Sequence, residues 1–123
     1  MKQAGGGAMV HFSTIQCLRG DSKPQDAYAA SKVGVGALSK SLAMQLVQYG
    51  IRSNTIFPGL THTPLQARWQ TEDDVKAVGK YVPLGRIARP GEVANAALFL
   101  LSAGASCIIG TELIADGSLL MGY

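Results

Sequence analysis

Three short apolar runs, separated by longer segments of helical character, constrain the fold of this 123-residue chain more than any other feature. The runs are Ala8 to Ser13, Ile51 to Phe57 and Thr111 to Ala115, and each has the length and composition of a buried strand. Helical patterns lie between them, at Tyr28 to Gln48 and at Val93 to Ser102. This alternation predicts parallel β-α-β units. We therefore expect an α/β fold with a three-stranded parallel sheet.

The segment from Tyr28 to Gln48 carries two apolar stripes along one helix, one bulky and one of small residues. The bulky stripe is Val35, Leu38, Leu42 and Leu46, and the small one is Ala30, Gly34, Ala37 and Ser41. Two apolar stripes imply two packing partners. We expect the bulky stripe to face the sheet and the small one to admit a second helix at close range, such as one from another subunit.

Tyr28 and Lys32 begin this helix and are four residues apart, so their side chains project from the same face. A phenol titrates near about 10 and is a poor acid or base at neutral pH, but a neighbouring ammonium favours the phenolate and lowers the pKa. Tyr28 could then exchange a proton with a substrate oxygen. The spacing alone is a weak signal, because a Tyr and a Lys four residues apart on a helix usually belong to a solvated face.

Hydroxyl side chains follow the first two predicted strands. Ser13 and Thr14 end the first strand, while Thr61 and Thr63 follow the Pro58-Gly59 break that ends the second. Open α/β sheets bind ligands at the carboxyl ends of their strands, so these hydroxyls mark the predicted ligand site.

The sequence leaves the segment from Leu65 to Lys80 open between two interpretations. Its weak helical character and single tryptophan, Trp69, suit either a flap over the site or a surface helix with a packed indole. Leu65, Trp69 and Tyr81 are likewise compatible with a substrate pocket or with core packing.

Composition excludes several classes of function. Only 15% of residues are charged, which indicates that some apolar surface meets a partner, and the net charge of +3 comes from scattered residues rather than a basic run. Nucleic-acid binding is therefore not expected. No apolar run approaches the ~20 residues that span a membrane, and residues 1–8 do not form a secretory signal. Cys17 and Cys107 make no disulfide framework, and with His11 and His62 they show no metal-ligand spacing, so we expect a cytoplasmic protein without a metal.

Four further features occur in register across nearly the whole chain. They are Tyr28-Ala-Ala-Ser-Lys32; Asn54-Thr-Ile-Phe-Pro58-Gly59-Leu-Thr-His-Thr63-Pro64; Arg89-Pro90-Gly-Glu92-Val93-Ala94 with Phe99-Leu-Leu-Ser102; and Ile109-Gly110 with Asp116-Gly117. Together they resemble the short-chain dehydrogenase/reductase family, whose Tyr-x-x-x-Lys and Pro-Gly-x-x-x-Thr motifs the first two match. The resemblance implies part of a Rossmann-like, doubly wound parallel sheet and hydride transfer between NAD or NADP and a small-molecule carbonyl or secondary alcohol.

The resemblance also implies a role for each matching residue. Tyr28 would be the proton donor or acceptor, and Lys32 would lower its pKa and hold the nicotinamide ribose. The catalytic hydroxyl would belong to Thr14, with Ser13 as the alternative. The nicotinamide end would be lined by Pro58, Gly59, Thr61 and Thr63.

The nucleotide-binding half of the family has no counterpart in these residues. Gly5-Gly-Gly7 lacks the spacing of the family's glycine-rich turn and precedes a strand instead of following one. Residues 1–123 are therefore expected to be the C-terminal catalytic and substrate half, with the first strand at an open sheet edge. A homo-oligomer through the Tyr28-to-Gln48 helix and the C-terminal segment would cover exposed surface.

Two hypotheses about function follow. The chain is the catalytic portion of an NAD(P)-dependent oxidoreductase, or it is a catalytically silent fragment that acts by self-association or by pairing with a full-length relative. The absent glycine-rich turn counts against independent catalysis. The substrate depends on the segment from Leu60 to Tyr81 and on the family's other half. The choice of NAD or NADP depends on residues that this sequence does not contain.

Overall fold

The computed structural model describes residues 1–20, 24–64 and 71–122, and it confirms the predicted α/β fold. Its sheet consists of β1 (Gly7–Phe12), β2 (Ile51–Pro58) and β3 (Glu112–Ala115), which are parallel and lie in the order β1-β2-β3. Helix α2 (Asp26–Leu46) connects β1 to β2, and helix α4 (Pro90–Leu101) lies between β2 and β3. Each predicted strand and long helix is present, with boundaries that differ by at most three residues.

Shorter elements fill the connections. They are η1 (Lys2–Ala4), α1 (Gln16–Arg19), η2 (Val47–Tyr49), α3 (Glu72–Gly79) and η3 (Ala103–Ala105). The segment between β1 and α2 therefore contains a helical turn, α1, which the sequence analysis did not predict. Leu65 and Trp69 lie outside the described residues, whereas the described part of that segment is helical and begins with a capping box between Thr71 and Asp74.

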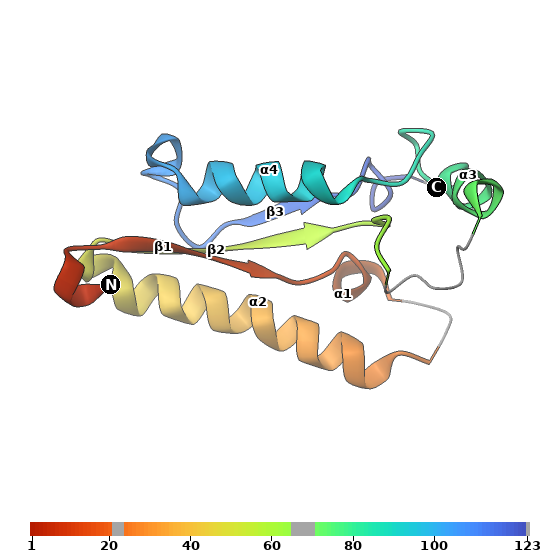
Figure 1. The fold of residues 1–123 in the computed structure, drawn as a ribbon. Coiled ribbons are helices and arrows are strands. Elements are labelled where there is room, and N and C mark those ends of the chain that lie inside the picture. Colours follow the sequence, from red (N-terminus) through yellow and green to blue (C-terminus); the bar gives the residue numbers. More distant parts are fainter. Residues whose placement is uncertain (21–23, 65–70, 123) are drawn as a thin grey trace.

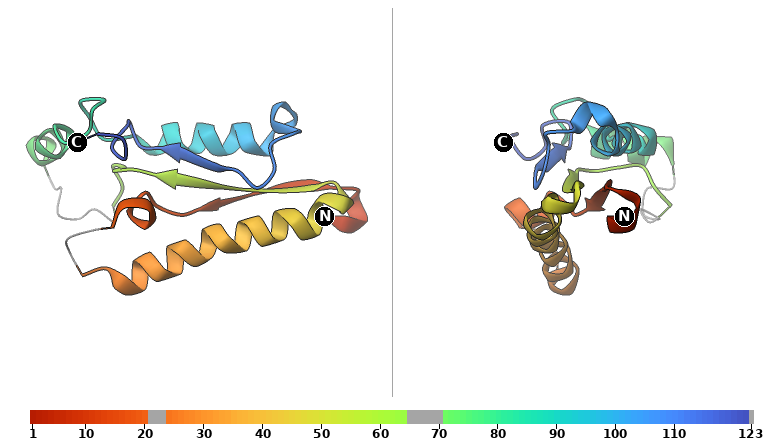
Figure 2. Two further views of the ribbon diagram at one scale, coloured as in Figure 1. Left: turned by 180° about the vertical axis from the view of Figure 1, so that it is seen from behind. Right: turned by 90° about the vertical axis from the view of Figure 1, so that its left-hand side faces the viewer.

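The helices cover both faces of the sheet. Figure 1 shows α2 along one face and α4 along the other, and the end-on view in Figure 2 confirms that the sheet lies between them. The layering is that of a doubly wound sheet. Among the helices described, none combines the length and the apolar character that crossing a bilayer requires.

The largest apolar core lies between α4 and the sheet. Ile56 of β2 packs against Val93 and Leu100 of α4, with Val10 and Leu113 at its margin. Arg52, from the same face of β2, donates from Nη1 to the carbonyl of Leu100 and from Nη2 to that of Ser102, at 2.8 and 3.0 Å. An arginine of the sheet thus satisfies the last carbonyl groups of α4.

The contact between α2 and the sheet uses small side chains, which corrects the predicted orientation of this helix. Its buried residues are Gly36, Ser39 and Ala43, whereas Leu38 is 54% exposed. A Cβ atom on Gly36 would lie 3.5 Å from Cζ of Phe57, so the bulk at this contact comes from β2. The other predicted stripe, Ala30, Gly34, Ala37 and Ser41, is exposed in this structure.

Strand β1 forms an open edge of the sheet. The register pairs Phe12 with Ile56, and the next residue, Ser13, donates its N–H to the carbonyl of Ile56 at 2.9 Å. In a parallel ladder this pattern turns the N–H and C=O groups of Phe12 away from β2. The predicted open edge is therefore confirmed in the three-stranded sheet that the structure describes.

Candidate active site

The predicted site residues gather at the carboxyl end of the sheet. Figure 1 shows that β1, β2 and β3 all point toward the end of the molecule where α1, α3 and the start of α2 lie. The residues that follow the three strands therefore lie at the same end of the molecule as the first turns of α2, as expected for a ligand site in an open parallel sheet.

Tyr28 and Lys32 both lie in α2 and project from one helix face, as their spacing predicted. Tyr28 is 40% exposed, and its backbone carbonyl accepts a hydrogen bond of 2.7 Å from Oγ of Ser31. Lys32 donates from Nζ to the carbonyl of Phe12 at 2.8 Å. The ammonium group is thus bound to the outward-facing carbonyl at the end of β1.

Ser13 and Thr14 are both buried, but their hydroxyl groups have different surroundings. Oγ of Ser13 donates to the backbone carbonyl of Lys32 at 2.8 Å and approaches Sγ of Cys17 at 3.7 Å. Oγ1 of Thr14 accepts a hydrogen bond of 3.3 Å from the backbone N–H of Gln16. Within the described residues, the Thr14 hydroxyl donates no hydrogen bond, so its proton remains available.

The loop after β2 is fixed from both sides. The Gly59 N–H donates to the carbonyl of Ala115 at 3.1 Å, and the carbonyl of Pro58 accepts from Ile15 at 3.2 Å. A Cβ atom on Gly59 would lie 2.7 Å from Cβ of Asp116, so close packing alone already requires glycine here. The same loop makes a parallel bridge between Thr61 and Ala88, and Thr63 is half-buried.

Asp116 shapes the turn after β3. Its carboxylate accepts hydrogen bonds from the backbone N–H groups of Ser118 and Leu120, at 2.8 and 2.6 Å. Asp116-Gly117, one of the pairs on which the family resemblance rests, thus forms this turn. The carboxylate is occupied by the backbone and is not directed at a ligand.

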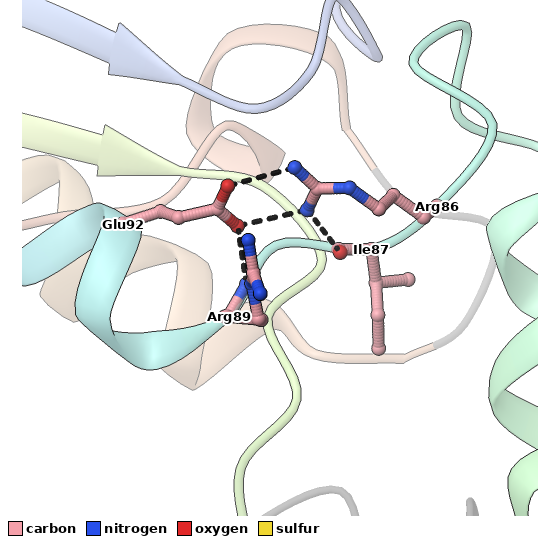
Figure 3. A network of polar contacts seen from close by, with 4 residues as sticks. All are labelled: Arg86, Ile87, Arg89 and Glu92. Atoms are coloured by element: carbon pink, nitrogen blue, oxygen red, sulfur yellow. Dashed lines mark hydrogen bonds and ion pairs between the residues drawn. The ribbon is translucent and has the colours of Figure 1, made fainter.

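A polar network before α4, drawn in Figure 3, was not predicted from the sequence. Arg86 binds Glu92 through both Nη atoms, at 2.8 and 2.7 Å, and the N–H of Arg89 donates to the same carboxylate at 2.8 Å. The Arg86 hydrogen bonds, followed by the one from Arg89, lower the pKa of Glu92 to about 2. The same pairing raises the pKa of Arg86. The available signal was Glu92 in the first turn after Pro90, but nothing in the sequence indicated its partner.

The other side chains that the sequence analysis singled out differ in their surroundings. His11 is hydrogen-bonded through Nε2 to Oγ of Ser53 at 3.1 Å, and Tyr81 is 79% exposed. Cys17 and Cys107 are free thiols. No group of three or more potential metal ligands occurs in the described residues.

Comparison with known proteins identifies the relatives of this arrangement. The family model described as enoyl-(acyl carrier protein) reductase matches residues 1–119. Over 118 residues the chain is 42% identical to cis-4-hydroxycyclohexanecarboxylate dehydrogenase of Sinomonas cyclohexanicum, covering 95% of this chain and 46% of the relative. The chain thus spans less than half the length of the first curated relatives it matches.

Solved structures agree with the sequence comparison. A crystal structure described as that of a short-chain dehydrogenase/reductase from Burkholderia xenovorans superposes with a TM-score of 0.89 at 31% identity, covering 100% of this chain and 47% of that one. A 2-deoxy-d-gluconate 3-dehydrogenase from Agrobacterium tumefaciens, solved with bound NADP, gives a TM-score of 0.86 at 31% identity, with 98% and 49% covered.

Proposed function

Because the chain belongs to the short-chain dehydrogenase/reductase family, we propose that its residues form the proton-transfer and nicotinamide-facing side of an NAD(P)-dependent oxidoreductase. The reaction interconverts a secondary alcohol and its carbonyl. The observation that carries this proposal is the attachment of the end of β1 to α2, one turn after Tyr28. It consists of two 2.8 Å hydrogen bonds, from Lys32 to Phe12 and from Ser13 to Lys32.

Tyr28 is the proton donor in reduction and the acceptor in oxidation. Its side chain is part-exposed at the ligand-binding end of the sheet, so its phenol can reach a substrate oxygen. Lys32 adds a positive charge one helical turn away, which favours the phenolate form that oxidation requires. The proton at the substrate oxygen therefore passes through a side chain held by α2.

Thr14 fits the role of the second hydroxyl better than Ser13. A group that polarises a substrate oxygen must donate its proton to that oxygen. Ser13 already donates to the Lys32 carbonyl, whereas Thr14 only accepts, from Gln16. Ser13 accordingly positions α2 against β1, and Thr14 contacts the substrate.

The residues present fit the nicotinamide end of the cofactor. When bound, the cofactor supplies or accepts the hydride. Pro58 and Gly59 would form the floor beneath it, with the Thr61 backbone and the Thr63 hydroxyl beside it. Gly59 lies against Asp116 without room for a Cβ atom, which keeps this floor rigid. The NADP-bound relative supports NADP or NAD as the cofactor class.

The relatives also suggest a substrate class. One relative is named for oxidation of a hydroxyl group on a cyclohexane ring. A small ring alcohol or cyclic ketone is therefore our proposed substrate, and cyclohexanol is a practical first probe.

A second candidate function is supported by the exposed apolar surface. Strand β1 has an open edge, and Leu38, Met44 and Leu98 are 54%, 80% and 63% exposed on the two long helices. A 123-residue polypeptide with these surfaces would pair with another chain, either a second copy or a longer relative. In that case its catalytic motifs would be silent. Self-association through α2 and the C-terminal segment is part of this proposal.

The test is calorimetric titration of the 123-residue chain with NADH and with NADPH, with its mass measured by light scattering in the same sample. Lys32→Ala should weaken binding at least about tenfold, since a charged hydrogen bond is lost. Tyr28→Phe should abolish cyclohexanol oxidation while binding persists. Tyr49→Phe is the matched control, because Tyr49 is 41% exposed and follows the opposite end of α2. A folded oligomer that binds neither cofactor would favour the second candidate.

A further inference from the structure

A cleft of about 440 Å³ lies between α3 and the segment before α4, on the far side of the loop that follows β2. It is distinct from the Tyr28 and Lys32 surface described above. Its lining is contributed by three stretches of chain and comprises His62, Val75, Lys76, Lys80, Gly85, Arg86, Ile87, Ala88 and Arg89.

The polar groups of this cleft are basic. Four lysine or arginine side chains and one histidine line it, and none of the described lining residues is acidic. Nearby carboxylates neutralise only part of this charge. Glu92 holds Arg86 through both Nη atoms (Figure 3), while Lys76 lies 3.8 and 3.9 Å from two carboxylates that are more than nine-tenths exposed. Such exposed pairs contribute little.

Lys80 is the cation that remains available. Its side chain forms no hydrogen bond or ion pair with the part of the chain that the structure describes, and it lies at the end of α3 beside the cleft. Arg89 offers a second source of donors, because its guanidinium is 77% exposed and lies 3.8 Å from Glu92 at Nε. An anion entering the cleft can therefore be bound without displacing the Arg86 pair.

Apolar side chains form the remaining walls. Ile87 is buried and packs with Val75 in the small core beneath α3, and Ala88 continues this wall. A bare inorganic ion would leave these walls in contact with water. A carboxylate or phosphate attached to an apolar body satisfies both the cations and the walls.

The cleft is mechanically connected to the nicotinamide-facing loop. Ala88 donates its N–H to Leu60 at 2.8 Å and accepts from the N–H of His62 at 2.9 Å, on either side of its bridge with Thr61. One wall of the cleft and the loop proposed to contact the nicotinamide are therefore parts of one short ladder.

We propose that this cleft binds an organic anion, through Lys80 and Arg89, with the apolar body of the ligand against Val75 and Ile87. The anionic group is a carboxylate of a substrate-like molecule or a phosphate of a nucleotide. The proposal concerns binding alone, so it can fail while hydride transfer stands, and the reverse.

The experiment is a titration of the ¹⁵N-labelled chain with cyclohexanecarboxylate, followed by amide shifts at Lys80, Ala88 and His62. Cyclohexanecarboxamide has the same shape without the charge and is the ligand control, and cyclohexyl phosphate, the same ring with a phosphate group, tests the phosphate source. Lys80→Gln removes the available cation. Lys2→Gln removes the same charge from η1, at the amino end of the sheet, and is the protein control.

Saturable shifts confined to the cleft are expected with the carboxylate and not with the carboxamide. Lys80→Gln should weaken the affinity for the carboxylate about tenfold, because one charged hydrogen bond is lost, and Lys2→Gln should leave that affinity unchanged. Tighter binding of cyclohexyl phosphate would assign the site to a phosphate, and tighter binding of the carboxylate to a substrate. Equal weakening by both lysine variants, equal binding of the carboxamide, or shifts outside the cleft would overturn the proposal.

Discussion

Asn54 and Thr55 are neighbours on β2 and are both buried, at 0% and 1% exposure, yet their substitution should have opposite consequences. Asn54 donates from Nδ2 to the carbonyl of Ile108 at 2.9 Å and accepts at Oδ1 from the N–H of Thr111 at 3.0 Å. It therefore holds the segment that enters β3. The hydroxyl of Thr55 has no hydrogen-bond partner in the described structure.

The magnitudes follow from these partners. Asn54→Ala removes two hydrogen bonds at ~1 kcal/mol each and takes away the partner of the Thr111 N–H, whereas the Ile108 carbonyl keeps a bond of 3.4 Å from Nη1 of Arg52. The free energy of unfolding should therefore fall by about 2–4 kcal/mol. Small domains are stable by only ~5–15 kcal/mol in total. Thr55→Val keeps the shape and removes a hydroxyl that is buried without a partner, so it should be neutral or stabilising by about 1 kcal/mol.

The assay is urea unfolding followed by far-ultraviolet circular dichroism, at one protein concentration because association would shift the midpoint. Thermal midpoints should differ in the same direction, by roughly 4–8 °C per kcal/mol for a chain of this size. Thr55→Val keeps the side-chain volume, so if it destabilises the chain as much as Asn54→Ala, the Thr55 hydroxyl itself contributes stability and the reasoning from its unpartnered burial is refuted.

Three further substitutions test the contacts around the site. Because Glu92 has its pKa lowered to about 2 from 4.5, its contribution to stability is complete above about pH 5 and declines as pH falls toward 2. The difference in unfolding free energy between the unsubstituted chain and Glu92→Gln should therefore narrow between about pH 5 and pH 2, and a constant difference would contradict this. Gly59→Ala places a Cβ atom 2.7 Å from Cβ of Asp116, so it should cost ~1–3 kcal/mol in urea unfolding and weaken NADPH binding; unchanged values would show that this contact relaxes freely. Arg52→Lys can retain only one of the two hydrogen bonds to the end of α4, so amide hydrogen exchange in the last turn of that helix should become severalfold faster. Unchanged exchange would show that these hydrogen bonds do not stabilise the end of α4.

The sequence was sufficient for the order of strands and helices because each apolar run is short, bounded by turns and placed at β-α-β spacing. It was insufficient for the orientation of α2. Hydrophobic periodicity ranks Leu38 above Gly36, but helix and sheet approach closely only where side chains are small, and Phe57 fills the space that remains. The buried face of α2 therefore lies between the two predicted stripes, and its position depended on a residue of another element.

The candidate site likewise contains residues that could be paired from the sequence and residues that could not. Tyr28 and Lys32 could be paired from sequence because their relation is local to one helix. The choice between Ser13 and Thr14 could not, since it depends on a hydrogen bond to a carbonyl 19 residues further along the chain. The partner of Glu92 could not be predicted either. Arg86 precedes α4 and is six residues away, a spacing that no helix or strand periodicity pairs with Glu92.

The geometry at Phe12 links the open edge of the sheet to the proposed chemistry. Its carbonyl faces away from β2, and the Lys32 ammonium binds it at 2.8 Å. A strand that paired with this edge would direct an N–H group toward the same carbonyl, since outward-facing carbonyls are the acceptors of the next parallel ladder. The Phe12 carbonyl has two lone pairs and can accept from both donors, but a second donor weakens its bond to Lys32. We therefore expect pairing at this edge to loosen the Lys32 ammonium, so cofactor binding and molecular mass must be measured in the same sample.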